Sequence, residues 1–403
     1  MRQILNSPLI VLLNAAILMG VFIPMFYVCF LMNGYEYSGN ILNLNNWHIH
    51  EMLFGFGFFV ILSFRLLERK LDVSLLEYGS SYINITWVFL AFLFLVERFL
   101  WASQINEAFV IPVKLFSITI SFFALFHSYN ESKALNFSRS SLMLMDLPLI
   151  VGQILFLFRL DHFITNEISY TQFVIFYLYH YFKIIFLYYF LMKYFPMVRS
   201  LFLRDISIAF RLGTLLIMNL ILLLVSYLAC KYLNFAKVLL VTEFLFFIWL
   251  FKKHFILSIK NSFFIKTTIF VWALIFLLFF IDWLVLNNII TTSGKPNIHL
   301  LMMGVMTLLF VIQVMEYLCS HYGLDLVFKP SAWINVIIAC LILGFLYRVF
   351  YPLFQVPIFS LHLHSAMGIW TLGLLMLFIF INHKMFRSSG SGSNEILINL
   401  KGL

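Results

Sequence analysis

The segment Trp47–Gly55, with the sequence WHIHEMLFG, places two histidines and a glutamate at the start of a long apolar run. Ionisable side chains inside a bilayer cost roughly 2.5–3.5 kcal/mol each on insertion scales, so they are rare there and mark functional positions. Imidazole is the commonest metal ligand, and an adjacent carboxylate suits the same chemistry. The alternative is that two histidines at a helix end lie in the hydrated headgroup layer. The segment therefore indicates either a metal site or a polar helix end.

The composition around this segment is that of an integral membrane protein. Of the 403 residues, 63% are hydrophobic and 11% are charged, whereas soluble domains contain about 25% charged residues. The net charge of +9 comes from Lys and Arg in short loops between apolar runs, with no basic stripe, which excludes nucleic-acid binding. The four cysteines lie in or beside apolar runs and form no CxxC or CxxCH motif, which excludes covalent haem attachment and a cysteine zinc site.

Apolar runs long enough to cross a bilayer recur along the chain. A spanning helix needs about 20 apolar residues, so we expect an all-α bundle of about twelve transmembrane helices, forming a single membrane domain over residues 1–387. A flexible Gly/Ser-containing tail over 388–403 follows it. No sequence repeat is visible, which leaves room for a diverged inverted repeat. The expected spans are 8–32, 47–67, 82–101, 108–129, 141–160, 170–192, 208–231, 237–256, 263–290, 297–319, 331–351 and 358–383.

Lys and Arg in the loops predict the orientation. With the N-terminus in the cytoplasm, most of the 26 Lys and Arg residues fall on the inner side, and the first outer loop, 33–46, carries none. The first apolar run is too long for a signal-peptide core and has no small-residue cleavage site, so it predicts a retained helix. Both termini are therefore expected in the cytoplasm.

This topology brings several histidines to the outer side of the membrane. Those in or beside spans come from three different helices and enter the bilayer at one depth. Inward-facing histidines at one level of a bundle are how such bundles hold haem or metal, although interfacial histidines also tolerate the headgroup zone. Arg348 lies at the same depth and would pair with a haem propionate. The outer histidines are His48, His50, His162, His299, His362 and His364.

Helix geometry limits what each histidine pair can ligate. At about 100° per residue, His48 and His50 point about 200° apart, as do His362 and His364, so neither pair chelates one metal from a regular helix. Glu51 shares a face with His48 and would orient it as an outer-shell acceptor. Equally, Glu51 would serve as a proton carrier, which makes it the candidate catalytic residue.

Other charges inside the spans are expected to form local ion pairs or to snorkel toward the surface. They are Glu97, Arg98, Lys114, Lys183, Glu243, Asp282 and Glu316.

Trp47–Gly55 resembles the WHxHEMLFG signature of the NnrS family, twelve-helix bacterial membrane proteins associated with haem, copper and protection from nitric oxide stress. A second match starts at His299–Gly304, which resembles the family's H-(x)4-G run, and continues through Met306-Thr307 and Val314-Met315 to His321. A third, weaker match is Arg348-Val349. The chain departs from the family at Glu316, where an Arg is usual, and at Ser320-His321-Tyr322, which replaces Gly-His-Thr.

The resemblance implies metal-ligand roles for His48, His50 and His299, and adds His321, which the topology places on the opposite side. His362 and His364 are candidate ligands from the depth argument alone, and Trp47 and Arg348 are candidate cofactor contacts.

The implied function is that of a bacterial inner-membrane protein with haem b, and with copper as a second candidate metal, in nitric oxide metabolism or resistance to nitrosative stress. Electrons would come from a quinol or another membrane donor, because the chain has no flavin or iron–sulfur motif. If it is an enzyme, which the sequence leaves open, it is an oxidoreductase acting on nitric oxide or a related small molecule. The alternative is a proton- or ion-coupled transporter that uses the His/Glu cluster.

The orientation can be tested with a single cysteine placed in the loop 33–46 of an otherwise cysteine-free chain. Because this loop is expected on the outer side, an impermeant thiol reagent added to intact cells should label it. A cysteine in the 132–138 loop, expected in the cytoplasm, is the matched control and should react only in inverted vesicles. The opposite pattern would invert the topology.

Overall fold

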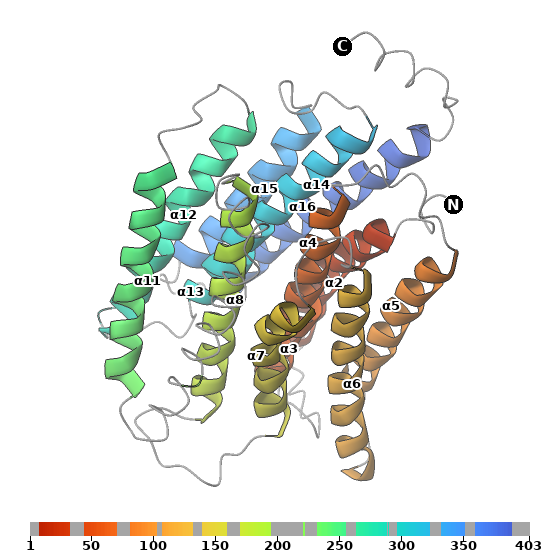
Figure 1. Ribbon diagram of the computed structural model, residues 1–403, viewed down its shortest axis with the longest axis horizontal. Helices are drawn as coiled ribbons and strands as arrows, with labels where there is room; N and C mark the ends of the chain where they lie inside the picture. The colour runs from red at the N-terminus through yellow and green to blue at the C-terminus, as the bar shows by residue number, and fades with distance from the viewer. Residues whose placement is uncertain are drawn as a thin grey trace.

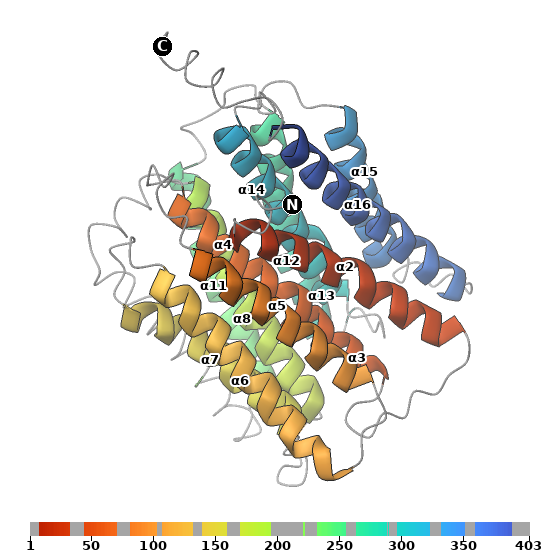
Figure 2. The same cartoon turned by 90° about the vertical axis from the view of Figure 1, so that its right-hand side faces the viewer.

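The computed structural model describes residues 8–32, 44–70, 81–102, 107–131, 139–158, 170–194, 232–254, 263–287, 296–322, 332–350 and 359–388, with 221 and 289 as single residues. Every element in these ranges is a helix, and together they form one bundle (Figures 1 and 2). Six of the described helices are long and apolar enough to cross a membrane. The chain is therefore an all-α membrane protein, as predicted.

Each expected span overlaps a helix except 208–231, which lies outside the described residues apart from 221. His162 also lies outside the described residues, and so does the tail that follows Ser388. The count of twelve spans and the side of the termini remain predictions. The helices are α2 (Pro8–Met32), α3 (Leu44–His50), η1 (Glu51–Gly57), α4 (Phe58–Lys70), α5 (Ser81–Ala102), α6 (Glu107–Glu131), α7 (Arg139–Phe158), α8 (Tyr170–Tyr194), α11 (Tyr232–His254), α12 (Phe263–Leu286), α13 (Pro296–His299), η5 (Leu300–Met306), α14 (Thr307–Tyr322), α15 (Ala332–Phe350) and α16 (Phe359–Ser388).

Two helices form the centre of the bundle. The first central helix joins α3, η1 and α4, and 94% of its Trp47–Phe64 span is buried inside the protein. The second central helix joins α13, η5 and α14, and 89% of its Pro296–Met315 span is buried. In the other four candidate spans the buried share is 33–50%, because one side of each faces outward. These two buried helices are the ones that carry the histidine motifs.

Both central helices widen into a π-helix at the same point of a shared motif. Ile49-His50 is followed by η1 and by Gly55, and Ile298-His299 is followed by η5 and by Gly304, at the same spacing. The two π-helices pack against each other. A Cβ on Gly57 would lie 3.0 Å from the Met302 side chain, so this glycine allows their close approach. The sequence analysis recognised no repeat, yet here the chain uses one local design twice.

A π-helix forms i→i+5 hydrogen bonds and occurs mostly as a single turn, often at a functional site. Its wider turn changes which backbone N–H and C=O groups are paired, and side chains form hydrogen bonds to carbonyl groups in the turn. In η5, the Thr307 hydroxyl donates to the Met302 carbonyl at 2.8 Å. Polar side chains beside these turns therefore stabilise the irregular backbone.

The peripheral helices pack around this pair. α2 lies along the first central helix and α12 along the second. α16 packs against α15 and also against α2, and Figure 2 shows these three helices on one side of the bundle. Asn14 and Asn382 exchange side-chain hydrogen bonds of 3.3 and 3.1 Å between α2 and α16. Paired amides of this kind satisfy polar groups within an apolar contact.

The contact between α15 and α16 depends on the absence of a side chain at Gly344. A Cβ there would lie 2.6 Å from the Cβ of Trp370 and 2.8 Å from its backbone nitrogen. We expect Gly344→Ala to force the helices apart and to lower stability by about 1–3 kcal/mol, measured as thermal unfolding in detergent. Gly368→Ala on α16 is the matched control, because nothing lies within 4 Å of its Cβ. Equal unfolding temperatures for the two variants would contradict this account of the packing.

Candidate functional site

The centre of the site is a buried triad of His50, Glu51 and Arg98. His50 Nδ1 lies 3.0 Å from Glu51 Oε1, and Arg98 Nη1 donates to the same oxygen at 2.8 Å. Arg98 Nη1 also lies 3.3 Å from His50 Nδ1. His50 and Glu51 are fully buried. The charges on Glu51 and Arg98 therefore have to compensate each other, because a buried charge without a partner is costly.

Glu51 has a different partner from the one predicted. The sequence analysis placed Glu51 beside His48 on a regular helix, whereas its carboxylate contacts His50 in the structure. The reason is Arg98 on α5. Its Nη1 lies 2.8 Å from Glu51 Oε1 and 3.3 Å from His50 Nδ1, so both side chains turn toward the same guanidinium.

Arg98 connects α5 to the π-helix in two ways. Its Nη1 binds Glu51, and its Nη2 donates to the Phe54 carbonyl inside η1 at 2.8 Å. Nη2 also lies 3.5 Å from Glu97 Oε2. The local Glu97–Arg98 pair expected from the sequence is present, but the shorter contacts of Arg98 are to the first central helix.

Aromatic rings enclose the triad. The ring of His50 lies 5.1 Å from that of Phe54 and 5.9 Å from that of Phe156 on α7. The Arg98 guanidinium lies 5.9 Å above the Phe94 ring. This apolar surround lowers the local dielectric and strengthens the ion pair.

The other predicted residues of the first central helix lie next to the triad in sequence. His48 is buried, and Arg348 on α15 is close enough to interact with it electrostatically. Trp47 is 6% exposed, and its indole Nε1 is buried without a hydrogen-bond partner among the described residues. The structure therefore places Arg348 near His48, at the end of the first central helix that also carries Trp47 and His50.

The remaining predicted ligands lie on the second central helix and on α16. His299 is half-buried and ends α13, immediately before η5. His321 belongs to the last turn of α14, and His362 and His364 to the first turns of α16, but their side chains are outside the described part of the structure. Within the described residues, no three His, Cys, Asp or Glu side chains are grouped closely enough to hold a metal ion.

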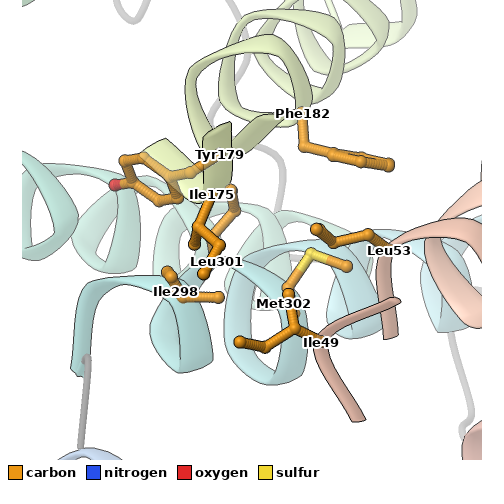
Figure 3. A pocket seen from close by; sticks show the side chains of 8 residues that line it. All are labelled: Ile49, Leu53, Ile175, Tyr179, Phe182, Ile298, Leu301 and Met302. Carbon is orange, nitrogen blue, oxygen red and sulfur yellow. The ribbon is translucent and has the colours of Figure 1, made fainter. Parts of the chain in front are cut away.

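A small apolar cavity lies between the two central helices and α8 (Figure 3). The centre of a water-sized sphere has about 10 Å³ available to it, which is the room for one such molecule. The lining side chains are Ile49, Leu53, Ile175, Tyr179, Phe182, Ile298, Leu301 and Met302. Ile49 precedes His50 and Ile298 precedes His299, so the cavity lies where both histidine motifs meet.

A second buried polar cluster was missed by the sequence analysis. Lys183 on α8 contacts both Glu243 on α11 and Asp282 on α12. These residues were expected to form local pairs or to reach the surface. Their partners are instead far along the chain, so sequence spacing gave no signal for the contact.

Comparison with known proteins finds no matching family model, no matching curated protein and no matching solved structure. The resemblance to NnrS therefore rests on its motifs and remains a prediction.

The triad predicts a strong dependence of stability on Arg98. Arg98→Met leaves the buried carboxylates of Glu51 and Glu97 without this cation, and breaking a buried ion pair costs about 3–5 kcal/mol. We expect a correspondingly large loss of unfolding free energy in detergent. Adding Glu51→Leu to this variant should restore part of the stability, because it removes one uncompensated charge. Lys237→Met on α11 is the control, since Lys237 is only partly buried. If Arg98→Met lost no more unfolding free energy than Lys237→Met, the assignment of Arg98 to a buried ion pair would be contradicted.

Proposed function

We propose that this chain is a bacterial inner-membrane haem protein that binds or converts nitric oxide, with copper as the second candidate metal. The observation that carries the proposal is the His50–Glu51–Arg98 triad. Metal-ligating histidines almost always bond a carboxylate or carbonyl through the second ring nitrogen, which fixes the tautomer and makes the ligand more basic. His50 Nδ1 has this contact with Glu51 at 3.0 Å, so Nε2 is the atom that would bind iron or copper.

Glu51 is better suited to hold His50 than to carry protons. Its Oε1 is engaged by Arg98 at 2.8 Å, and this cation compensates the carboxylate charge. The same oxygen lies 3.0 Å from His50 Nδ1, so the carboxylate is fixed between the guanidinium and the ring. We therefore assign Glu51 a positioning role.

Other buried groups around the triad suit the periphery of a haem. Arg348 beside His48 is 8% exposed, and a guanidinium binds a propionate carboxylate through paired hydrogen bonds. The Trp47 indole N–H is a buried donor with no hydrogen-bond acceptor in the described part of the chain. A propionate would satisfy it. His48 and His299 are the candidate further ligands on the two central helices.

The cavity between the central helices suits a small uncharged ligand. Water in a cavity needs two to four polar partners, whereas this lining is almost entirely aliphatic and aromatic. A diatomic gas loses no hydrogen bonds on entering it. When bound, a ferrous haem or copper would supply the affinity for nitric oxide and accept electrons from a quinol or another membrane donor.

The first experiment is an optical spectrum and a metal analysis of the detergent-purified protein. We expect reduced-minus-oxidised haem bands that change when nitric oxide is added. A protein that stays free of haem and copper, even when both are supplied during expression, would refute the proposal and favour the proton- or ion-coupled transporter.

Substitution of the ligands should separate metal binding from folding. His48→Ala, His50→Ala and His299→Ala should each lower haem or copper per protein by several-fold while the protein still inserts into the membrane. His383→Ala is the matched control, because His383 is exposed on α16 and should leave the metal content unchanged. Full metal content in all three variants would overturn the ligand assignment.

A further inference from the structure

The second cluster joins three helices around one buried lysine. Lys183 Nζ lies 2.6 Å from Glu243 Oε2 and 3.2 Å from Asp282 Oδ2. The Lys183 side chain is fully buried, between the rings of Tyr179 and Phe279 at 5.5 and 5.1 Å. A lysine in this position requires anions beside it, because an isolated buried ammonium is very costly.

Asp282 is the fixed anion of the cluster. The Tyr179 hydroxyl lies 2.7 and 2.8 Å from its two oxygens, and Asn297 donates to Oδ1 at 3.0 Å. With Lys183 on Oδ2, both oxygens accept hydrogen bonds. These donors come from α8 and α13 and hold the carboxylate in one position.

Glu243 is held differently. Its Oε2 contacts Lys183, and its Oε1 lies 3.5 Å from His180 Nδ1. His180 is 1% exposed, and neither of its ring nitrogens has a hydrogen-bond partner among the described residues. Its ring contacts Phe176 at 4.3 Å and Tyr179 at 5.5 Å. His180 is thus a buried imidazole that faces a carboxylate.

The charges of these groups do not balance while His180 is neutral. Lys183 contributes one positive charge and Glu243 and Asp282 contribute two negative charges. The sum is −1 in a buried environment, where an uncompensated charge costs several kcal/mol. One proton on His180 brings the sum to zero. Asp146 on α7, which also packs against α8, accepts from Tyr181 at 3.2 Å and belongs to a separate contact.

A proton fits this cluster better than a metal cation does. Hard cations need about six oxygen ligands, but Asp282 is surrounded by donors and Glu243 Oε2 faces Lys183. The remaining oxygen, Glu243 Oε1, faces the His180 imidazole, and an imidazole binds a proton on a ring nitrogen.

We propose that His180 and Glu243 form a buried proton-binding pair, with Lys183 and Asp282 fixing the charge around it. The proton is bound by His180 Nδ1 and faces Glu243 Oε1. The Glu243 side chain is 11% exposed, whereas those of Lys183 and Asp282 are 0% and 3% exposed. Tyr179 binds Asp282 and also lines the cavity between the central helices, which connects the pair to that cavity. None of the candidate metal ligands belongs to this cluster, so the proposal does not depend on haem or copper.

Nitrogen-15 NMR of histidine-labelled protein in lipid membranes tests the pair directly, because the imidazole nitrogens report protonation. The His180→Gln variant identifies the His180 signal. We expect this signal to change from neutral to imidazolium as the pH falls from about 9 to about 5. Glu243→Gln should weaken proton binding at least tenfold, seen as a midpoint at least one pH unit lower, because it removes the attracting carboxylate.

Glu97→Gln is the matched control, since it removes a buried carboxylate outside the cluster and should leave the His180 midpoint unchanged. A His180 signal that stays neutral over the whole range, or that titrates identically in wild type and Glu243→Gln, would overturn the proposal. If Glu243→Gln does not fold, Glu243→Asp replaces it, because this variant withdraws the carboxylate by one methylene. The His180 midpoint should then fall by a smaller amount, measured in the same way. The wild-type titration is decisive in either case.

Discussion

The buried contact between Arg98 and Glu51 is the constraint on which the centre of this bundle depends. Two charges removed from water are stable only when they meet, so α5 has to dock against the first central helix at this level. The same guanidinium donates to the Phe54 carbonyl, which ties it to the backbone of η1 as well. One side chain therefore fixes the position of a peripheral helix, the shape of the π-turn and the orientation of His50.

The two π-turns directly follow the histidines of the central helices, so they shape the candidate site as well as the packing. Glu51 opens the first π-turn, and its carboxylate contacts the ring of the preceding His50 beside Arg98. The second turn begins at Leu300, directly after His299, and packs against the first. Irregular backbone of this kind is stable in a membrane only where protein surrounds it and side chains complete its hydrogen bonds. The burial of both central helices meets this requirement.

The sequence predicted the helices well because apolar runs of spanning length are a local signal. It also placed Arg348 at the depth of His48, and the two are close enough in the structure to interact electrostatically. It did not predict the partner of Glu51, because Arg98 on another helix draws Glu51 and His50 together. The contacts of Lys183 were missed for a related reason. Its partners Glu243 and Asp282 lie on other helices, and helix rotation within a bundle is decided by packing that single-sequence periodicity does not encode when a helix is apolar all round.

The two buried clusters share one electrostatic composition. Each combines a cation, two carboxylates and a histidine: Arg98, Glu51, Glu97 and His50 in one, and Lys183, Glu243, Asp282 and His180 in the other. In each cluster the imidazole ring lies against a carboxylate, and a carboxylate beside a ring nitrogen suits either a bound proton or a bound metal. Both clusters are buried among apolar and aromatic side chains that keep the local dielectric low, so a charge gained on one histidine acts strongly on its own cluster.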